Sequence, residues 1–380
     1  MISLSQPPPF SNYGILTGQM FLYQQGQAAF ESPPPRALSR AQAQAPAPSS
    51  PSSGESDLSG LFRPNKLILI GGLSDGLLPV PYLQELYDEI CGGSGDGSGR
   101  DDGRDTSWSI VQPTTRSSYT GFGHGSLARD CDDLSKLLVY LSTYRGAQRF
   151  ALLGHSTGCQ DLVYFWKHAD GGIPVDIKSK IKLLILQAPV SDREGVEDSD
   201  QDLPSKIQYA QSLVDNGKGD EMVPRSYFWT PMTAQRFLDL HQRNGKDDFF
   251  SSDFSDDELN DRLSHISDGI RDPTSSNTDD EKDTAITKPD HELKVLVAYS
   301  GEDEYVPSYI NKQLLTERLV NAMNANCYIT SVKNKKEHPQ MNLVAHGLNL
   351  PTGNHNLSKN PDDVKLFINT VSKMIQNISC

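Results

Sequence analysis

The pentapeptide Gly-His-Ser-Thr-Gly at residues 154–158 constrains the fold more than any other feature of this chain. It follows the apolar run 150–153 and precedes a helical pattern with apolar residues on one side, Leu162, Val163, Phe165 and Trp166. A serine between two glycines at a strand-to-helix turn is the pattern of a nucleophile elbow. The turn is so tight that side chains at the two flanking positions would clash, which favours glycine there. We predict that Ser156 is a nucleophile; the alternative is a glycine-rich turn carrying a solvated serine.

The length and composition of the chain limit its domain number and its possible partners. Its 380 residues are enough for one large α/β domain with insertions or for two ordinary domains. A net charge of -14 disfavours nucleic acid and anionic membranes as partners, because both attract basic patches. No run approaches the roughly 18 apolar residues of a membrane span, and residues 1–9 lack the features of a secretory signal. Five scattered cysteines predict neither disulfides nor a zinc site. We expect a cytoplasmic protein that uses no cofactor and no metal.

Apolar runs alternate with amphipathic segments along the chain. The runs predict strands at residues 18–23, 67–70, 108–111, 150–153, 182–186, 293–299 and, as the last strand, 327–332. One helix face is indicated by Leu134, Leu137, Leu138 and Leu141. The final helix is expected to begin with Asn360 as N-cap and Pro361 at its first position. Its apolar face comprises Val364, Phe367, Val371 and Met374. The alternation predicts an α/β fold, a mostly parallel sheet with helices on both faces.

Low-complexity segments and one long gap divide the chain. Residues 31–60 are rich in Pro, Ser, Ala and Gln, and residues 92–106 are rich in Gly, Ser, Asp and Arg. We interpret both as insertions without a packed core of their own. They fall within residues 1–191, the predicted first part of a hydrolase core. Residues 192–290 are predicted to form a helical cap, and residues 291–380 the second part of the core.

The predicted cap is acidic. It is too long for a loop, and it contains a capping box at Ser255–Glu258 followed by an apolar stripe of Leu259, Leu263 and Ile266. Residues 192–290 hold 24 Asp and Glu against 11 Lys and Arg, so their net charge is 11 minus 24, or -13. Either these charges lie on solvated helix faces, or the cap is a lid whose field favours cationic or amine-bearing substrates.

A nucleophilic serine needs a base, and the base needs a group that orients it. In α/β-hydrolases the chain order is serine, acid, histidine. The predicted strand 293–299 runs into an acidic loop, and we choose Asp303 there over Glu302 and Glu304 because of its distance from Val306-Pro307. Asp192, after the preceding strand, is a second candidate acid. Three histidines follow Asp303, namely His338, His346 and His355. His355 is the predicted base because it directly precedes the final helix, with His346 as the alternative.

The negative charge that develops on the substrate oxygen also needs donors. The backbone N–H of Thr157, the residue after the nucleophile, is one candidate. Leu73, in the glycine-rich loop after the strand 67–70, is our choice for the second oxyanion donor. Ser74 and Asp75 in the same loop are candidate substrate-binding residues. A plain glycine-rich turn is the alternative interpretation of this loop.

At four places the sequence resembles the DUF1749 family of α/β-hydrolases. The segments are IGGLSDGLL at 70–78, GHSTGCQD at 154–161, GEDEYVP at 301–307 and GNHNLS at 353–358. The chain is most similar to filamentous-fungal members, which include a fusarinine C esterase. The resemblance implies an α/β-hydrolase fold and an intracellular serine esterase acting on a small-molecule partner. That substrate would be a fusarinine-type hydroxamate siderophore, fusarinine C or triacetylfusarinine C, whose hydrolysis releases iron held by the substrate itself.

Two other functions remain open at this point. The chain could hydrolyse another small ester, thioester or amide with the same residues. It could also be a hydrolase-fold receptor that senses a ligand without rapid turnover. The intact order of Ser156, Asp303 and His355 disfavours the receptor.

Overall fold

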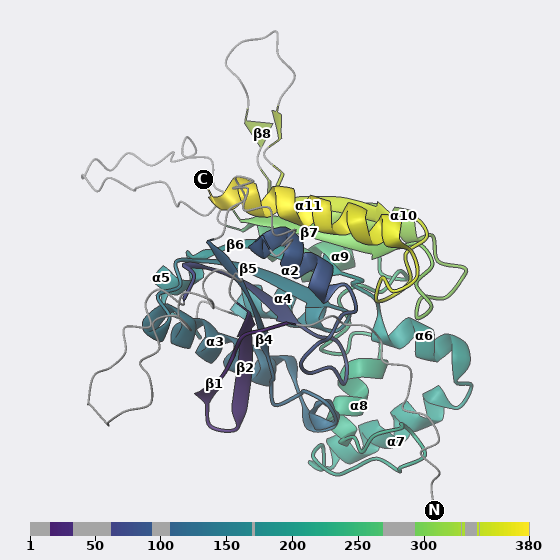
Figure 1. Ribbon diagram of the computed structural model, residues 1–380. Helices are drawn as coiled ribbons and strands as arrows, with labels where there is room; N and C mark the ends of the chain where they lie inside the picture. Colours follow the sequence, from purple (N-terminus) through teal and green to yellow (C-terminus); the bar gives the residue numbers. More distant parts are fainter. Residues whose placement is uncertain are drawn as a thin grey trace, which may run out of the picture.

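The computed structural model describes residues 16–32, 62–92, 107–168, 172–268, 293–327, 329–330, 340–341 and 343–379. Nearly all of the two predicted low-complexity insertions lies outside these residues, as do His338 and residues 269–290 of the predicted cap. An eight-stranded sheet forms the centre of the described structure (Figure 1). No helix in the described part of the chain is long and apolar enough to cross a membrane.

The sheet has the strand order β1-β2-β4-β3-β5-β6-β7-β10. Six neighbouring strands, from β4 to β10 in that order, pair in parallel, and β1 and β2 extend one edge in antiparallel fashion. Its strands are β1 (Gln19–Gln24), β2 (Gln27–Ser32), β3 (Asn65–Ile70), β4 (Trp108–Pro113), β5 (Arg149–His155), β6 (Ile181–Gln187), β7 (Lys294–Ser300) and β10 (Ala345–Leu350). The predicted mostly parallel sheet is therefore confirmed.

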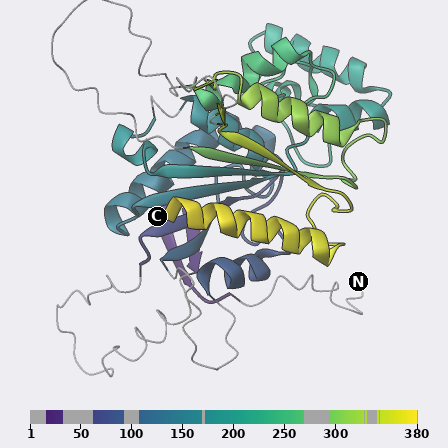
Figure 2. The same ribbon diagram turned by 90° about the horizontal axis from the view of Figure 1, so that it is seen from above.

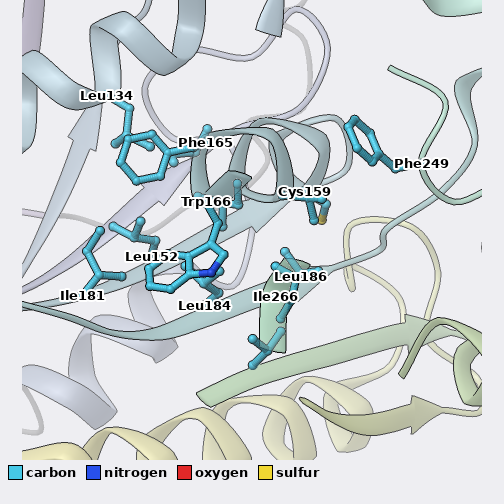
Figure 3. Packing of buried hydrophobic residues seen from close by; sticks show 14 of the residues in the cluster. Leu134, Leu152, Cys159, Phe165, Trp166, Ile181, Leu184, Leu186, Phe249 and Ile266 are labelled. Carbon is cyan, nitrogen blue, oxygen red and sulfur yellow. The ribbon is translucent and has the colours of Figure 1, made fainter. Parts of the chain in front are cut away.

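Helices cover both faces of the sheet, as predicted. Successive strand residues point to opposite faces, so Ile68 and Ile70 belong to one apolar core while Leu67 and Leu69 belong to another. The first core contains α3 (Leu127–Tyr144), α4 (Gly158–His168), α5 (Val175–Lys178), α9 (Asp256–Leu263) and α10 (Lys312–Met323). The second contains α2 (Leu83–Cys91) and α11 (Pro361–Ser379), which lie together on the other side of the sheet (Figure 2). Figure 3 shows the first core around α4, where Phe165 and Trp166 pack near Leu152 and Leu184.

The prediction that the strand at 327–332 is the last one is wrong. Residues 329–330 form β8 (Ile329–Thr330), which pairs with β9 (Gln340–Met341) in a separate two-stranded ribbon. The strand that completes the sheet beside β7 is β10. Because β10 lies at the sheet edge, three of its six side-chain positions are exposed, at residues 346, 347 and 349. It therefore lacks the continuous apolar run by which buried strands are recognised.

The chain between β6 and β7 forms its own helices. They are α6 (Asp192–Ser199), α7 (Leu203–Asp215), α8 (Ala234–His241), α9 and the short η3 (Ser264–Ser267). The capping box at Ser255–Glu258 is present as predicted. A small apolar core joins α7 and α8 to Phe122 of η1 (Gly121–His124), with Leu203, Met232 and Phe237 buried in it. This local core explains how the segment holds its shape beside the sheet.

Candidate active site

Ser156 lies in the turn between β5 and α4. Its φ of 54° is in the left-handed region, which costs a non-glycine residue on the order of 1–3 kcal/mol. The backbone N–H of Ser156 donates to the Gln187 carbonyl at 3.0 Å, which holds the turn against β6. A Cβ on Gly154 would lie 2.3 Å from the Gly158 carbonyl oxygen, and one on Gly158 would lie 2.6 Å from that of Ile70. Close backbone contacts therefore require both flanking glycines, as the pattern predicts.

Asp303 and His355 form a hydrogen-bonded pair at the carboxyl ends of β7 and β10. The distance from His355 Nδ1 to Asp303 Oδ2 is 2.8 Å. The Asp303 side chain is fully buried, and its Oδ1 accepts the Tyr305 backbone N–H at 3.0 Å. A carboxylate only accepts hydrogen bonds, so Nδ1 of His355 carries the proton and Nε2 keeps the free lone pair. The Tyr305 ring covers the His355 ring edge-on, with centroids 4.6 Å apart.

The other candidate acids and bases make different contacts. Asp192, at the start of α6, accepts a hydrogen bond from Gln160 Nε2 at 2.9 Å. Glu304 accepts the backbone N–H of His355 at 2.9 Å and so positions the histidine loop. His346 is exposed on the edge strand β10. Among the alternatives weighed from the sequence, only Asp303 is bonded to the ring of His355 in the described structure.

Ser156, Asp303 and His355 all line one cavity of about 1110 Å³. Its walls are the loops that follow the parallel strands, together with α6 and the segment before α8. Trp229 and Tyr305 add aromatic surface to the walls, and each is more than half exposed. The volume slightly exceeds the range of about 300–1,000 Å³ usual for small-molecule sites. The cavity can therefore admit a large ligand.

The lining of this cavity is acidic. Against one lysine, Lys312, it contains six carboxylate residues: Asp75, Asp192, Asp198, Glu302, Asp303 and Glu304. The Lys312 ammonium is engaged by the backbone, because it donates to the carbonyls of Gly301 and Asp303 at 2.9 and 3.0 Å. Part of the acidity predicted for residues 192–290 thus reaches the cavity through α6. The remaining carboxylates come from the core loops.

The loop after β3 lies directly against the turn at Ser156. A Cβ on Gly72 would lie 2.7 Å from Ser156 Cβ, so only glycine permits this approach. The Gly72 N–H donates to Asp75 Oδ2 at 2.8 Å, and the Asp75 N–H donates back to the Gly72 carbonyl at 3.0 Å. The backbone N–H groups of Leu73 and Thr157 make no hydrogen bond with other described residues. Both donors are therefore available where the two turns meet.

The two predicted substrate-binding residues both line the cavity. Ser74 lies in the same tight loop and has a φ of 68°. The Asp75 carboxylate shapes that loop through its bond from Gly72, and burial raises the pKa of its carboxyl group. Asp75 is thus part of the wall and part of the support for the glycine-rich loop after β3.

Stability should depend on the protonation of Asp192. Burial, followed by the nearby Asp247 carboxylate, raises the pKa of Asp192 to about 7. In the unfolded chain an aspartate has a pKa near ~3.9, so the folded protein binds the extra proton between these values. The stability that comes from this tighter proton binding is fully present below the pKa of Asp192 in the unfolded chain. It is lost as the pH rises through the raised pKa of about 7 in the folded protein.

Asp192→Asn should remove that loss. Asparagine keeps an oxygen that can accept from Gln160, and it carries no charge to bury. We expect the free energy of unfolding at about pH 8 to rise by on the order of 1–3 kcal/mol relative to wild type, with little difference near pH 4. Urea denaturation at the two pH values measures this, with the exposed Asp198→Asn as control. Identical pH dependence in wild type and Asp192→Asn would contradict the assignment.

Sequence reasoning missed one buried residue of the site, Gln187. It ends β6, its side chain is fully buried, and it contacts both His155 and the backbone of His355. The available signal was a polar residue directly after the apolar run 182–186, at the edge of the sheet where parallel strands present their binding residues.

The relatives found by comparison with known proteins are consistent with the family that the sequence resembles. The family described as "Protein of unknown function (DUF1749)" matches residues 49–335. A UPF0613 protein of Schizosaccharomyces pombe is 37% identical over 205 residues, which cover 51% of this chain and 59% of that protein. Fusarinine C esterase sidJ of Aspergillus fumigatus is 27% identical over 308 residues, covering 70% of this chain and 78% of the relative.

Among solved structures, siderophore hydrolase EstB from Aspergillus fumigatus superposes with a TM-score of 0.63 at 22% identity. The superposition covers 96% of this chain and 98% of EstB. At that identity the likeness shows the fold, and the chain has the α/β-hydrolase fold that its sequence predicts.

Proposed function

The chain belongs to the DUF1749 family, and from this premise we propose that it is a serine esterase, a carboxylic ester hydrolase. Ser156 is the nucleophile, His355 the base and Asp303 the group that orients it. The observation that carries the proposal is the 2.8 Å contact between His355 and Asp303 at the cavity that Ser156 also lines. Two relatives named as a fusarinine C esterase and an esterase support the reaction class.

The mechanism follows from the positions of the protons. His355 Nε2 takes the proton of the Ser156 hydroxyl while Oγ attacks the ester carbonyl, and Asp303 stabilises the imidazolium that forms. The N–H groups of Thr157 and Leu73 stabilise the oxyanion; losing one such donor typically costs on the order of 10²–10³ in rate. The imidazolium then protonates the leaving alcohol. Water, activated by the same imidazole, hydrolyses the acyl-enzyme and restores the serine.

The proposed substrate is a fusarinine-type hydroxamate siderophore, fusarinine C or triacetylfusarinine C. The similarity to fusarinine C esterase sidJ supports this choice. The cavity volume suits a large ester, and its acidic lining suits the free ornithine amines of fusarinine C. The iron is held by the substrate's hydroxamates, so hydrolysis aids its release without a protein metal site. The predicted cap, residues 192–290, covers this cavity through α6 and the segment from Phe228 to His241. The reaction takes place in the cytoplasm.

Mass spectrometry can test the proposed substrate. Purified protein is incubated with fusarinine C and with triacetylfusarinine C, each with and without iron. We expect linear, ring-opened hydrolysis products that are absent with heat-inactivated protein. If both siderophores stay intact while p-nitrophenyl acetate is hydrolysed, the chain acts on another small ester or thioester. If neither the siderophores nor p-nitrophenyl acetate is hydrolysed and a siderophore binds, the chain is a receptor and the proposed esterase function is wrong.

A further inference from the structure

Gln187 lies between the proposed nucleophile and the proposed base. It is the last residue of β6 and is fully buried. Its backbone carbonyl accepts the Ser156 N–H at 3.0 Å, and its side-chain Nε2 donates to the His355 carbonyl at 2.9 Å. Ser156 follows β5 and His355 follows β10, two strands that are not neighbours in the sheet. One residue therefore bonds to the backbone of both loops.

The hydrogen bonds determine which way the Gln187 amide faces. Its NH₂ group can only donate, so Nε2 faces the His355 carbonyl and Oε1 faces His155. Oε1 lies 2.6 Å from His155 Nδ1 and accepts a second bond from the Tyr82 hydroxyl at 3.3 Å. His155 Nδ1 must then carry its proton. Both ends of the amide are occupied, which fixes the side chain in one orientation.

The charge of His155 is set mainly by its burial, and its bond to Gln187 acts in the opposite direction on its pKa. Burial, and next the neighbouring His355, lower the pKa of His155 to about 3, so its ring stays neutral. The two rings lie with centroids 4.9 Å apart. A charged His155 would oppose the positive charge that His355 must take up from Ser156. Holding His155 neutral therefore leaves His355 free to become the imidazolium.

We propose that Gln187 is a positioning residue that sets the distance between Ser156 and His355 through its bonds to both loops, and that it orients the His155 ring beside them. The inference rests on the proposed serine-hydrolase function. An amide buried at the end of an apolar strand is costly unless its bonds are made. Gln187 makes three with its side chain, and two of these go to the histidines at the cavity.

The chain offers a matched control in Gln160. This glutamine on α4 is also fully buried, and its Nε2 donates to the Val190 carbonyl at 3.1 Å and to Asp192 at 2.9 Å. Its bonds hold the segment after β6 and do not include Ser156 or His355. Replacing either glutamine with methionine removes a buried amide of the same size. Only one of the replacements should disturb the proposed nucleophile and base.

The test compares Gln187→Met with Gln160→Met. The pre-steady-state burst with p-nitrophenyl acetate gives the acylation rate, and a fluorophosphonate probe gives the labelling rate of Ser156. For Gln187→Met we expect both rates to fall by about 10–100-fold, with KM within about threefold, because the base is misplaced. Gln160→Met should lower the melting temperature similarly but keep both rates within about threefold. Parallel losses of rate in the two variants, or Gln187→Met rates within twofold of wild type, would overturn the inference.

Gln187→Asn covers the case in which Gln187→Met does not fold. Asparagine keeps a polar group at the buried position but is one methylene too short to reach the His355 carbonyl. It should show the same fall in Ser156 labelling, and labelling within twofold of wild type would again overturn the inference. Experiments on the wild-type protein distinguish a wrong substrate from a wrong function. Labelled Ser156 without siderophore hydrolysis refutes only the proposed substrate, whereas wild-type protein that is neither labelled nor active refutes the proposed function.

Discussion

Ser156→Ala is expected to abolish ester hydrolysis, with a loss in kcat of about 10⁶-fold. The substitution removes only the hydroxyl oxygen, so the acyl-enzyme cannot form. The turn itself should persist, since alanine meets the same φ of 54° and the backbone bond to Gln187 is unchanged. We therefore expect the melting temperature to stay within a few degrees of wild type. Hydrolysis of p-nitrophenyl acetate and of fusarinine C, with thermal unfolding in parallel, measures both effects.

A second serine provides the control for this experiment. Ser308 is exposed and lines the same cavity. Ser308→Ala should keep kcat within about threefold, as expected for a surface substitution away from the reacting atoms. Esterase activity that survives in well-folded Ser156→Ala would show that another group attacks the ester. Siderophore binding by a wild-type protein without turnover would instead favour the receptor.

His355→Ala should be nearly as damaging, again with a loss in kcat of about 10⁶-fold, because nucleophile and base act as one unit. Unlike Ser156→Ala, it also leaves the buried Asp303 carboxylate without its ring partner. Asp303 retains the Tyr305 N–H, so we expect a destabilisation of about 1–3 kcal/mol and a protein that still folds. Activity assays and urea denaturation of the variant measure the two losses.

His346→Ala tests the alternative base directly. Its side chain is exposed on β10, so removing it should change neither kcat nor stability by a measurable amount. If His346→Ala loses activity and His355→Ala retains it, the base assignment is wrong. If both are active and Ser156→Ala is not, the serine is activated by a different group, and Asp303 has no role through His355.

Much of the fold can be predicted because its strands are buried on both faces. The apolar runs around Leu67–Ile70 and Phe150–Leu153 have that character, and both become central strands of the parallel sheet. The edge strand β10 does not, because half of its side-chain positions meet solvent. The run at 327–332, which resembles a strand, predicts the last strand in the wrong place. The spacing of apolar residues along the sequence indicates which side chains are buried, so only buried helices and strands carry a strong pattern.

The residues of the site also differ in how far the sequence predicts them. The tight turn at Ser156 needs its two glycines within five residues, so its pattern is visible in the sequence. Asp303 and His355 lie 52 residues apart along the chain, and the sequence predicts their pairing from chain order and from their places after a strand and before the final helix. Gln187 carries only a weak signal, a polar residue after an apolar run, because its partners at Ser156, His155 and His355 come from two other loops.

Local sterics and burial leave a period in the chain, so the sequence alone predicts the buried strands, the helices between them and the glycine-flanked serine turn. The strand that closes the sheet, the carboxylate that meets the imidazole and the glutamine that links the two loops become known only from the folded arrangement. Those contacts join residues brought together by the strand order, and hydrogen bonds between distant loops leave no spacing in a single sequence.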